Sequence, residues 1–476
     1  MTRNGGTERF DLAVIGAGAG GLSVTAVAAR LGLRVALIER DRMGGDCLNT
    51  GCVPSKALLA AAHAARAARD AARFGVLLDT PRIDWTRLRA HVAGVVAAIA
   101  PADSAARYRA LGAEVIAGEA RFLDPTTLAV GARRLTARRI VIAAGSRAAI
   151  PPIPGLDAVP YLTHETIFDL PAPPDHLLIL GGGPIGLELA DAFAGLGVAV
   201  TVVEAGRIAG REDPELAAGL RAALIAHGVR LTEGVAVAAV APGPTLVLAD
   251  GSRIAGSHLL VAAGRRPDLA ALALEAGGVR ASAAGIATDR GLRSRTNRRV
   301  FAVGDIADPE GIGPRAFTHL AAHHAGIVIR RAIFRLPARL DPRAFPRVTY
   351  TDPELAQVGA TEAEARAAGH DVRLLRWPLS ENDRAQAERA PAGLVKLVVA
   401  RGRLLGAGIL APGAGEMLGA LTLAVGRRLP VSALAAMIVP YPTRAEAAQR
   451  AAGTYFLDRL FAPRTQRLAR FLARLP

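Results

Sequence analysis

The sequence has 476 residues, of which 51% are hydrophobic and 21% charged, and it contains 51 Gly and 30 Pro. This composition is typical of a folded protein of about three domains, and it excludes an intrinsically disordered chain. No run reaches the ~18 consecutive apolar residues of a membrane-spanning helix. The first residues lack the hydrophobic region of a secretory signal, so we expect a cytoplasmic protein.

The net charge is +16, and only two of the 58 Lys and Arg residues are Lys, namely Lys56 and Lys396. A surface that binds nucleic acid gathers basic residues together with aromatic ones. Here the Arg residues are scattered and aromatic residues make up 4%, so we expect no nucleic-acid partner. A Lys that persists in an Arg-rich chain points to a position that requires a compact ammonium group. We expect a structural role for Lys396.

The first predicted element is a buried strand over residues 10–15, followed by a glycine-rich loop, a helix over about 22–31 and a strand that ends in Glu39. The loop has the pattern G-x-G-x-x-G, formed by Gly16, Gly18 and Gly21. In this strand–loop–helix–strand context the glycines let a pyrophosphate approach the helix N-terminus, and the acidic residue binds a ribose hydroxyl. The segment therefore predicts a dinucleotide site.

The only two cysteines, Cys47 and Cys52, follow this unit and are five residues apart. A disulfide that closes so short a loop restricts the unfolded chain little, which makes it a poor structural crosslink. A zinc site needs further ligands at motif spacing, and only His63 lies near. We therefore favour a redox-active pair over a metal site or inert thiols, and predict no bound metal. Lys56 lies one helical turn after Cys52.

The strand–loop–helix–strand unit recurs. A strand over 176–180 enters Gly181, Gly183 and Gly186, a helix extends to about residue 196, and a second strand ends in Glu204. The first glycine and the acidic residue are 23 residues apart in both copies, from 16 to 39 and from 181 to 204. Two dinucleotide sites are therefore predicted. Glu204 favours NADH over NADPH, and the nearby Arg207 leaves NADPH possible.

Further strands end in glycine turns or carboxylates. Residues 139–144 lead to Gly145, residues 259–263 to Gly264, and residues 300–303 to Asp305. The carboxyl ends of strands in α/β folds gather ligands, so we expect these turns near the dinucleotides. The region 341–476 has short strands and helices without a glycine loop, which indicates an α+β domain.

These segments together resemble the flavoprotein disulfide reductases, the family of dihydrolipoamide dehydrogenase, glutathione reductase and mercuric reductase. The resemblance covers essentially the whole chain and is most specific over residues 44–56. It implies an α/β fold with two Rossmann-like dinucleotide-binding domains and a C-terminal α+β dimerisation domain. The expected boundaries are 1–150 and 271–340 for the FAD-binding domain, 151–270 for the NAD(P)-binding domain and 341–476 for the interface domain.

The resemblance also implies residue roles. FAD contacts Gly16, Gly18, Gly21, Glu39, Gly145 and Asp305, while the nicotinamide dinucleotide contacts Gly181, Gly183, Gly186, Glu204 and the turn at Gly264. Cys52 is then the sulfur beside the flavin, and Cys47 is the thiol that exchanges with the acceptor. Lys56 matches the family lysine near the flavin, and Glu188 matches its ion-pair partner. Hydride from NADH passes through FAD to the Cys47–Cys52 disulfide, in active sites shared between the subunits of a homodimer.

One residue departs from the disulfide-reducing pattern. Those enzymes end in His-Pro-Thr-x-x-Glu, where His moves protons for the thiols and Glu orients it. Here Tyr441 replaces the His, while Glu446 matches the Glu. A phenol, with a reference pKa of ~10, is a poor proton shuttle at neutral pH. Tyr at this position is similar to mercuric reductase, although the C-terminal cysteine pair of that enzyme is absent from this sequence.

Three functions stay open at this point. We favour an NAD(P)H-dependent flavoenzyme whose acceptor is a metal ion, a quinone or a small disulfide. A dihydrolipoyl dehydrogenase is the alternative, and a non-catalytic flavoprotein redox sensor is an alternative of another class. For the Arg-rich segment after Phe456, whose apolar residues have helical spacing, we expect packing on the dimer rather than contact with a membrane surface.

Overall fold

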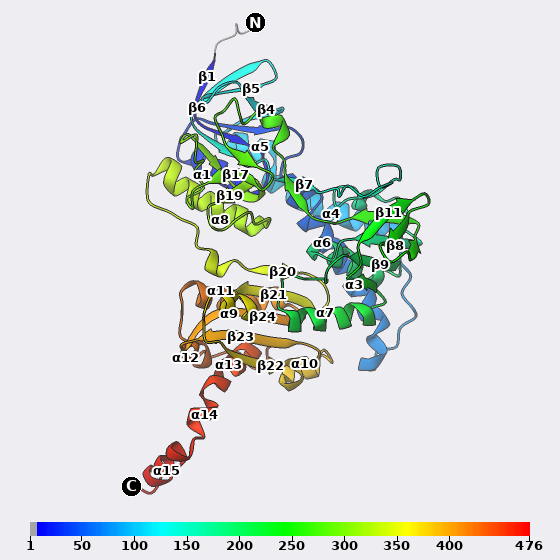
Figure 1. Ribbon diagram of the computed structural model, residues 1–476, viewed down its shortest axis with the longest axis vertical. Helices are drawn as coiled ribbons and strands as arrows, with labels where there is room; N and C mark the ends of the chain where they lie inside the picture. Colours follow the sequence, from blue (N-terminus) through cyan, green and yellow to red (C-terminus); the bar gives the residue numbers. More distant parts are fainter. Residues whose placement is uncertain (1–6) are drawn as a thin grey trace. The chain divides into compact units, whose positions relative to one another are not determined.

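The computed structural model describes residues 7–476 and divides into two compact units, which we describe separately (Figure 1). The first unit comprises the chain up to Gly182 together with Ala192–Ala205 and Val235–Leu340. The second unit comprises Gly183–Asp191, Gly206–Gly234 and Asp341–Pro476. Parts of the region expected to bind the nicotinamide dinucleotide thus group with the C-terminal domain.

The first unit contains the predicted parallel sheet. Its parallel strands lie in the order β3 (Glu114–Ala117), β2 (Val35–Glu39), β1 (Glu8–Ile15) and β6 (Arg133–Ile142), and β18 (Val300–Ala302) also pairs with β6. Antiparallel β5 (Thr127–Val130) and β4 (Ala120–Phe122) extend the sheet. The β2 strand and the C-terminal ends of β1 and β6 are apolar and buried, as is usual for a parallel sheet covered by helices.

The register brings four strand ends to one edge. Ile15 pairs with Ile38 and with Ile142, and Ile142 pairs with Ala302. Parallel strands in register end together, so the residues that follow β1, β2, β6 and β18 must lie side by side. Helix α1 (Ala19–Arg30) starts at this edge, and α8 (Thr318–Val328) packs against α1.

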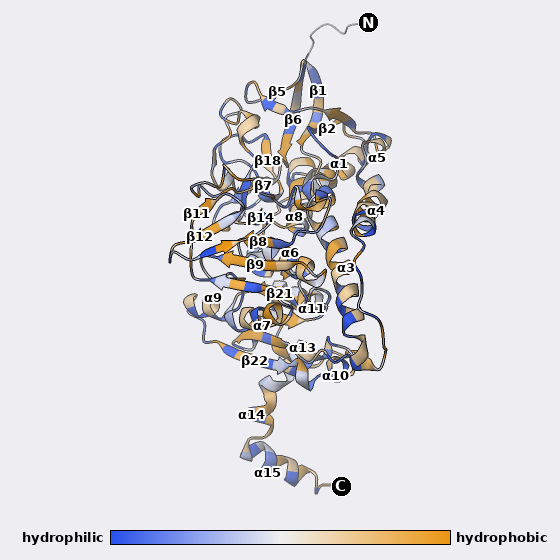
Figure 2. Ribbon diagram, turned by 90° about the vertical axis from the view of Figure 1, so that its right-hand side faces the viewer, coloured by the Kyte–Doolittle hydropathy of each residue, from blue (hydrophilic) through white to orange (hydrophobic). Residues whose placement is uncertain are grey.

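A second parallel sheet in the same unit contains β9 (Ala199–Glu204), β8 (His176–Leu180) and β14 (His258–Val261). Leu180 pairs with Val203 and with Val261, so these strands also end together. Their apolar character is visible in Figure 2. Antiparallel β11 (Val237–Ala241), β12 (Thr245–Leu248) and β13 (Arg253–Ala255) form a separate three-stranded sheet. Helix α6 (Pro184–Gly195) follows β8.

The second unit is built on an antiparallel sheet in the order β20 (Arg347–Thr349), β21 (Glu354–Gly359), β24 (Arg403–Ala411), β23 (Leu394–Ala400) and β22 (Arg373–Pro378). Alternate residues of β24 point to opposite faces. Ile409 belongs to a core shared with α11 (Ala414–Gly426) and α13 (Glu446–Gly453), whereas Gly408 lies against Leu216 of α7 (Pro214–Ala226). Helices therefore cover both faces of this sheet.

The α14 (Leu457–Leu460) and α15 (Pro463–Leu472) helices end the chain and extend away from the sheet of the second unit (Figure 1). Among the described helices, none combines the length and apolar character needed to cross a membrane.

Candidate active site

The first glycine loop connects β1 to α1 with the geometry of a dinucleotide site. Gly16 has φ +101°, and a Cβ placed there would lie 2.4 Å from the Ala143 carbonyl oxygen, so glycine is required. Gly18 caps α1 without a side-chain hydrogen bond, which leaves the first N–H groups of the helix available to a diphosphate. The Glu39 carboxylate accepts a hydrogen bond from Ala17 N at 2.6 Å. These residues fit the adenosine diphosphate part of FAD.

The ends of β6 and β18 complete this edge. Gly145 follows β6 with φ +70°, and Ser146 Oγ donates to Asp305 Oδ2 at 2.5 Å. Burial raises the pKa of the Asp305 carboxyl, against the opposing effect of the Ser146 hydrogen bond and the Arg265 charge. Asp305 was predicted as a flavin contact, and the structure brings it to the same edge as Glu39.

The second glycine loop repeats the arrangement after β8. Gly181 has φ +118°, and a Cβ there would lie 2.4 Å from the Ala262 carbonyl oxygen. The Glu204 carboxylate accepts from Gly182 N at 2.7 Å, the same relation that Glu39 has to its own loop. Gly183 and the buried Gly186 lie at the start of α6, where an added Cβ at Gly183 would meet no atom within 4 Å. This loop fits a second dinucleotide.

The two remaining glycine turns meet in a small ribbon. Strand β7 (Ser146–Ala148) follows Gly145, and β15 (Arg265–Pro267) follows Gly264; these strands pair antiparallel. Gly264 has φ +129°, which a residue with a side chain rarely adopts. The ribbon joins the turns that follow the two parallel sheets of the first unit.

The cysteine segment packs on the first glycine loop. Gly44 N donates to the Ala17 carbonyl at 2.9 Å, and a Cβ on Gly45 would lie 2.8 Å from the Gly18 Cα atom. The next residues form α2 (Gly45–Asn49), which carries Cys47, and α3 (Cys52–Arg69), which begins at Cys52. The glycines at 44 and 45 therefore let the cysteines approach the place where the first dinucleotide binds.

Both cysteines are thiols in the structure, with Cys47 half-buried and Cys52 exposed. The Sγ atom of Cys52 lies 3.3 Å from the Thr318 hydroxyl at the start of α8. The hydrogen bond to Cys52 and burial raise the pKa of Cys47, and the nearby Asp46 charge adds to this effect. Cys52 lies at the N-terminus of α3, a position that favours an anion.

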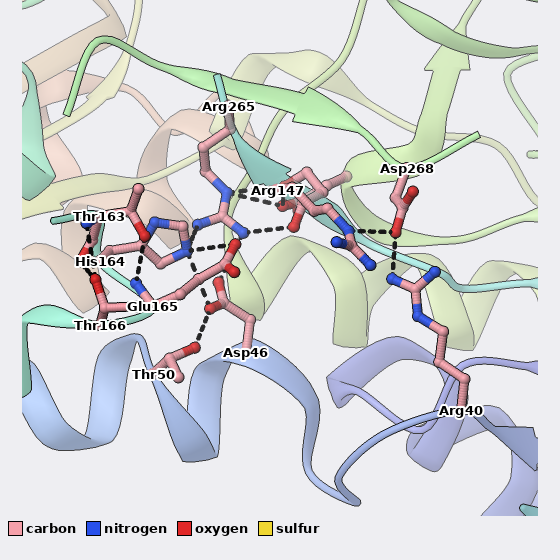
Figure 3. Close-up of polar contacts among 12 residues, drawn as sticks. Arg40, Asp46, Thr50, Arg147, Thr163, His164, Glu165, Thr166, Arg265 and Asp268 are labelled. Atoms are coloured by element: carbon pink, nitrogen blue, oxygen red, sulfur yellow. Dashed lines mark hydrogen bonds and ion pairs between the residues drawn. The ribbon is translucent and has the colours of Figure 1, made fainter. Parts of the chain in front are cut away.

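Asp46 stands at the centre of a polar network beside the cysteines (Figure 3). It accepts from Arg265 Nη2 at 2.7 Å and from the Thr50 hydroxyl at 2.6 Å, and His164 Nε2, which lies 3.2 Å from it, accepts from Arg265 Nη1 at 2.7 Å. Burial raises the pKa of Asp46, but the contact with His164 and the Arg265 charge outweigh it and hold that pKa well below its usual range. Arg265 Nε also donates to the Ser146 hydroxyl at 2.8 Å. The network joins the cysteine segment to the ribbon of glycine turns.

Lys56 and Glu188 occupy different compact units, so the ion pair expected between them stays a prediction. Lys56 lies on α3, one turn after Cys52, and its Nζ donates to Ser55 Oγ at 3.4 Å. Glu188 is buried on α6, where it accepts from Tyr350 N at 3.0 Å.

Tyr441 is exposed in the second unit, and its hydroxyl donates to Asp383 Oδ2 at 2.8 Å. This hydrogen bond raises the pKa of Tyr441 above its ordinary value. Glu446, which matches the orienting Glu of the disulfide-reducing pattern, instead accepts from Arg450 Nη2 at 2.6 Å. The partner of the phenol is therefore Asp383, and the proton that Tyr441 holds is retained at neutral pH.

Sequence reasoning did not select Asp46, His164, Arg265 or Asp383 as site residues. The signals available were weak: Asp46 precedes Cys47, and Arg265 follows a glycine turn. Asp46 is more than 100 residues from both His164 and Arg265, and Asp383 is 58 residues from Tyr441. Only the folded chain shows these pairs.

Two dinucleotide loops and a cysteine pair packed on the first of them define a nucleotide-dependent thiol oxidoreductase. The sequence matches the family described as pyridine nucleotide-disulphide oxidoreductase over residues 10–327 and the dimerisation domain of that family over residues 345–452. The chain belongs to the pyridine nucleotide-disulphide oxidoreductases. It is an FAD-dependent enzyme that oxidises NAD(P)H and acts on a disulfide or a metal ion, and its dimerisation domain makes it a homodimer.

Several characterised proteins are similar to this chain. Mercuric reductase of Streptomyces lividans is 40% identical, with 94% of this chain and 97% of the relative covered. Mercuric reductase of Acidithiobacillus ferrooxidans is 36% identical, with 95% of this chain and 83% of the relative covered.

Solved structures share the fold. The Cu(II) complex of the HOCl-induced flavoprotein disulfide reductase RclA from Escherichia coli superposes with a TM-score of 0.83 at 26% identity, covering 94% of this chain and all of that one. LpdA from Mycobacterium tuberculosis gives a TM-score of 0.84 at 27% identity, with the same coverage. The expected fold class, family and cofactors are thereby confirmed.

Proposed function

We propose that this enzyme transfers electrons from NADH to a thiophilic metal ion, Hg(II) or Cu(II), at the Cys47–Cys52 pair. The names of the mercuric reductase relatives and the Cu(II) complex of RclA support a metal acceptor. Thiolate is the protein ligand that such soft ions prefer. One NADH supplies two electrons, which reduce one Hg(II) to Hg(0) or two Cu(II) to Cu(I), with release of NAD⁺ and a proton.

The observation that carries this proposal is the pairing of Tyr441 with Asp383. Reduction of a disulfide substrate requires a group that gives a proton to the leaving thiolate. A phenol whose pKa is raised by a carboxylate is unsuited to that transfer near neutral pH. Reduction of a metal ion has no thiol leaving group, so it does not require such a proton donor.

The residues of the first unit have defined tasks in this proposal. FAD, when bound, supplies the two-electron relay between NADH and the sulfur atoms. Glu39 and the loop at Gly16, Gly18 and Gly21 hold its adenosine diphosphate part, and Gly145 and Asp305 line the same edge. Cys52 supplies the thiolate that faces this edge, and Cys47 exchanges with the acceptor. Lys56 contributes a positive charge one turn away from Cys52.

Residues of the second glycine loop select the nicotinamide dinucleotide. Gly181, Gly183 and Gly186 hold its diphosphate, and Gly264 lines its other side. The Glu204 carboxylate, held on Gly182 N, is placed to accept from a ribose hydroxyl and disfavours a phosphate there, so we infer a preference for NADH. The same proposal includes the domain boundaries, with residues 1–150 and 271–340 binding FAD, 151–270 binding NAD(P)H and 341–476 forming the interface. It also includes active sites shared between subunits and a cytoplasmic location.

NADH oxidation by the purified holoenzyme tests the proposal, with Hg(II), Cu(II) and lipoamide as parallel acceptors. We expect metal-dependent turnover that Cys47→Ser abolishes, and little turnover with lipoamide. Tyr441→His is expected to raise lipoamide turnover by about 10²-fold or more, because general acid–base catalysis contributes about that much. Tyr441→Phe is the matched control and is expected to leave lipoamide turnover low.

Two outcomes would overturn this assignment. Fast lipoamide turnover by the unmodified enzyme, without metal reduction, would establish the dihydrolipoyl dehydrogenase alternative. Turnover near zero with every acceptor would establish the non-catalytic redox sensor.

A further inference from the structure

The last twenty residues form a separate amphipathic segment, which we call the C-terminal tail (residues 457–476). In α15 the apolar side chains of Leu468, Phe471 and Leu472 are spaced as i, i+3 and i+4, so they share one face of the helix. They are 55%, 62% and 51% exposed. Leu460 and Phe461, just before the helix, are similarly exposed. Together they form an apolar surface that no part of residues 7–476 covers.

Basic residues flank this apolar face. Arg467, Arg470 and Arg474 follow one another at helical spacing beside it, with Arg459 and Arg464 nearby. The sequence holds no Asp or Glu after Asp458. Within the described residues, none of the five Arg side chains forms an ion pair with a carboxylate, whereas Arg373 of β22 pairs with Asp458 at 2.7 Å. Figure 2 shows hydrophilic and hydrophobic residues interleaved along α15.

The partner of such a surface must offer both apolar contact and negative charge. A second copy of this chain carries a net charge of +16, so like charges oppose its docking on a segment with five unpaired Arg residues. The match to the dimerisation domain ends at residue 452, before the tail begins. A nucleic acid would neutralise the Arg residues but leave the Leu and Phe side chains exposed to water. An anionic lipid bilayer offers phosphate headgroups above an apolar interior and satisfies both needs.

We propose that the C-terminal tail lies in the surface of an anionic lipid bilayer and attaches the enzyme to it. Pro463 begins α15 after a break at Ala462, so this helix has an axis of its own and can lie parallel to the membrane plane. The apolar face enters the boundary between headgroups and acyl chains, while the long Arg side chains extend to the headgroups. The pair between Arg373 and Asp458 fixes the start of the tail to the sheet of the second unit. Our sequence-based expectation that the tail packs on the dimer is tested by the same experiments.

Co-sedimentation of the full-length holoenzyme with lipid vesicles tests this proposal. We expect binding to vesicles of phosphatidylcholine mixed with phosphatidylglycerol, and at least about tenfold less binding to phosphatidylcholine alone. Replacing Arg467, Arg470 and Arg474 with Gln is expected to weaken binding by about 100-fold at low salt, since each basic residue near such a surface contributes about 1 kcal/mol. Replacing Leu468, Phe471 and Leu472 with Ser is expected to weaken binding at every salt concentration.

Control variants change the same residue types outside the tail. Leu77 is 84% exposed, and Leu77→Ser removes one exposed apolar side chain elsewhere, while Arg87→Gln with Arg138→Gln removes two positive charges outside the tail. These controls are expected to bind vesicles like the parent. Every tail variant is expected to keep the NADH-dependent turnover of the parent in solution, which shows that it folds.

Three results would overturn the proposal: equal binding to both kinds of vesicle, no binding to either, or undiminished binding by a chain that ends at Ala462. If that truncation instead converts the dimer to a monomer in light scattering and the parent ignores vesicles, the tail is a contact between subunits.

Discussion

The Arg265 guanidinium holds the Asp46 carboxylate at 2.7 Å, one residue before Cys47. The pair joins the ribbon of glycine turns to the cysteine segment, and Arg265 also donates to His164 Nε2 at 2.7 Å. The hydrogen bond to Cys52 and burial are the main causes of the raised pKa of Cys47, and the Asp46 charge adds to them.

Asp46→Asn is therefore expected to lower the pKa of Cys47. Removal of one nearby negative charge shifts a pKa by about one unit, which corresponds to an approximately tenfold faster alkylation of Cys47 at a fixed alkaline pH. The measurement is iodoacetamide labelling of the reduced holoenzyme, with the Cys47 peptide quantified by mass spectrometry. Asp268→Asn is the control, because it removes the partner of Arg40 and Arg147 in the same region and leaves Asp46 intact (Figure 3). Equal labelling of Asp46→Asn and parent would contradict this role.

Glu204→Gln is expected to raise the KM for NADH by about tenfold and leave kcat nearly unchanged. The substitution removes the charged acceptor held on Gly182 N, and a hydrogen bond to a charged group contributes about 1.5–3 kcal/mol. The preference for NADH over NADPH should narrow, because the carboxylate no longer repels a phosphate. Steady-state kinetics with both dinucleotides measure this, and the exposed Glu310→Gln is the control. A change in kcat alone would contradict the assignment.

Because of His324, we expect the free energy of unfolding to decrease as the pH falls into the mildly acidic range. Its Nδ1 accepts from Gly304 N at 3.2 Å, and burial lowers its pKa to about 4 from the ordinary 6.5. Because the folded pKa is depressed, the unfolded chain takes up the proton first as the pH falls below 6.5. Stability therefore decreases down to about pH 4, by about 3 kcal/mol in total.

The pH dependence of thermal unfolding, followed by the fluorescence of released flavin, measures this effect. His324→Gln keeps an acceptor for Gly304 N and is expected to show a shallower decline of the melting temperature over the same pH range. The exposed His370→Gln controls for the loss of any imidazole. Parallel pH curves for His324→Gln and the parent would refute the role.

Lys396→Met is expected to destabilise the second unit by about 3–5 kcal/mol. Lys396 is buried, and its Nζ lies 2.9 Å from both Asp213 Oδ2 and Glu215 Oε2. Removal of the ammonium leaves the buried Asp213 carboxylate uncompensated, which is more costly than the absence of the whole pair. A second substitution, Asp213→Asn, keeps the cap of α7 and should restore part of the melting temperature. If the double variant is no more stable than Lys396→Met, the charge argument fails.

Local patterns in the sequence were sufficient to predict both glycine loops and their acidic residues. Each loop needs glycine for reasons of backbone conformation and close approach, as the positive φ angles of Gly16 and Gly181 show. The period of the flanking strands places Glu39 and Glu204 at the end of the neighbouring strand. These determinants lie within about 25 residues of one another, so they leave a readable signal.

Local sequence patterns could not predict the polar network around Asp46 or the packing of α7 within the second unit. The ion pair between Asp46 and Arg265 depends on the pairing of β7 with β15, which no local pattern specifies. Similarly, α7 packs on β24 of the second unit through Gly219 and Leu410, although the sequence places it next to the second glycine loop. Contacts of this kind are set by the tertiary arrangement rather than by propensity.

The burial of Lys396 has a practical consequence for protein chemistry. The chain has only two lysines, so a lysine-specific protease acting on the unfolded protein yields residues 1–56, 57–396 and 397–476. In the folded enzyme Lys396 is only 4% exposed, which shields it from amine-directed reagents. Apart from the N-terminal amine, the half-buried Lys56 is therefore the one lysine left to such a reagent. A label on Lys56 would lie one helical turn from Cys52, within the proposed active site.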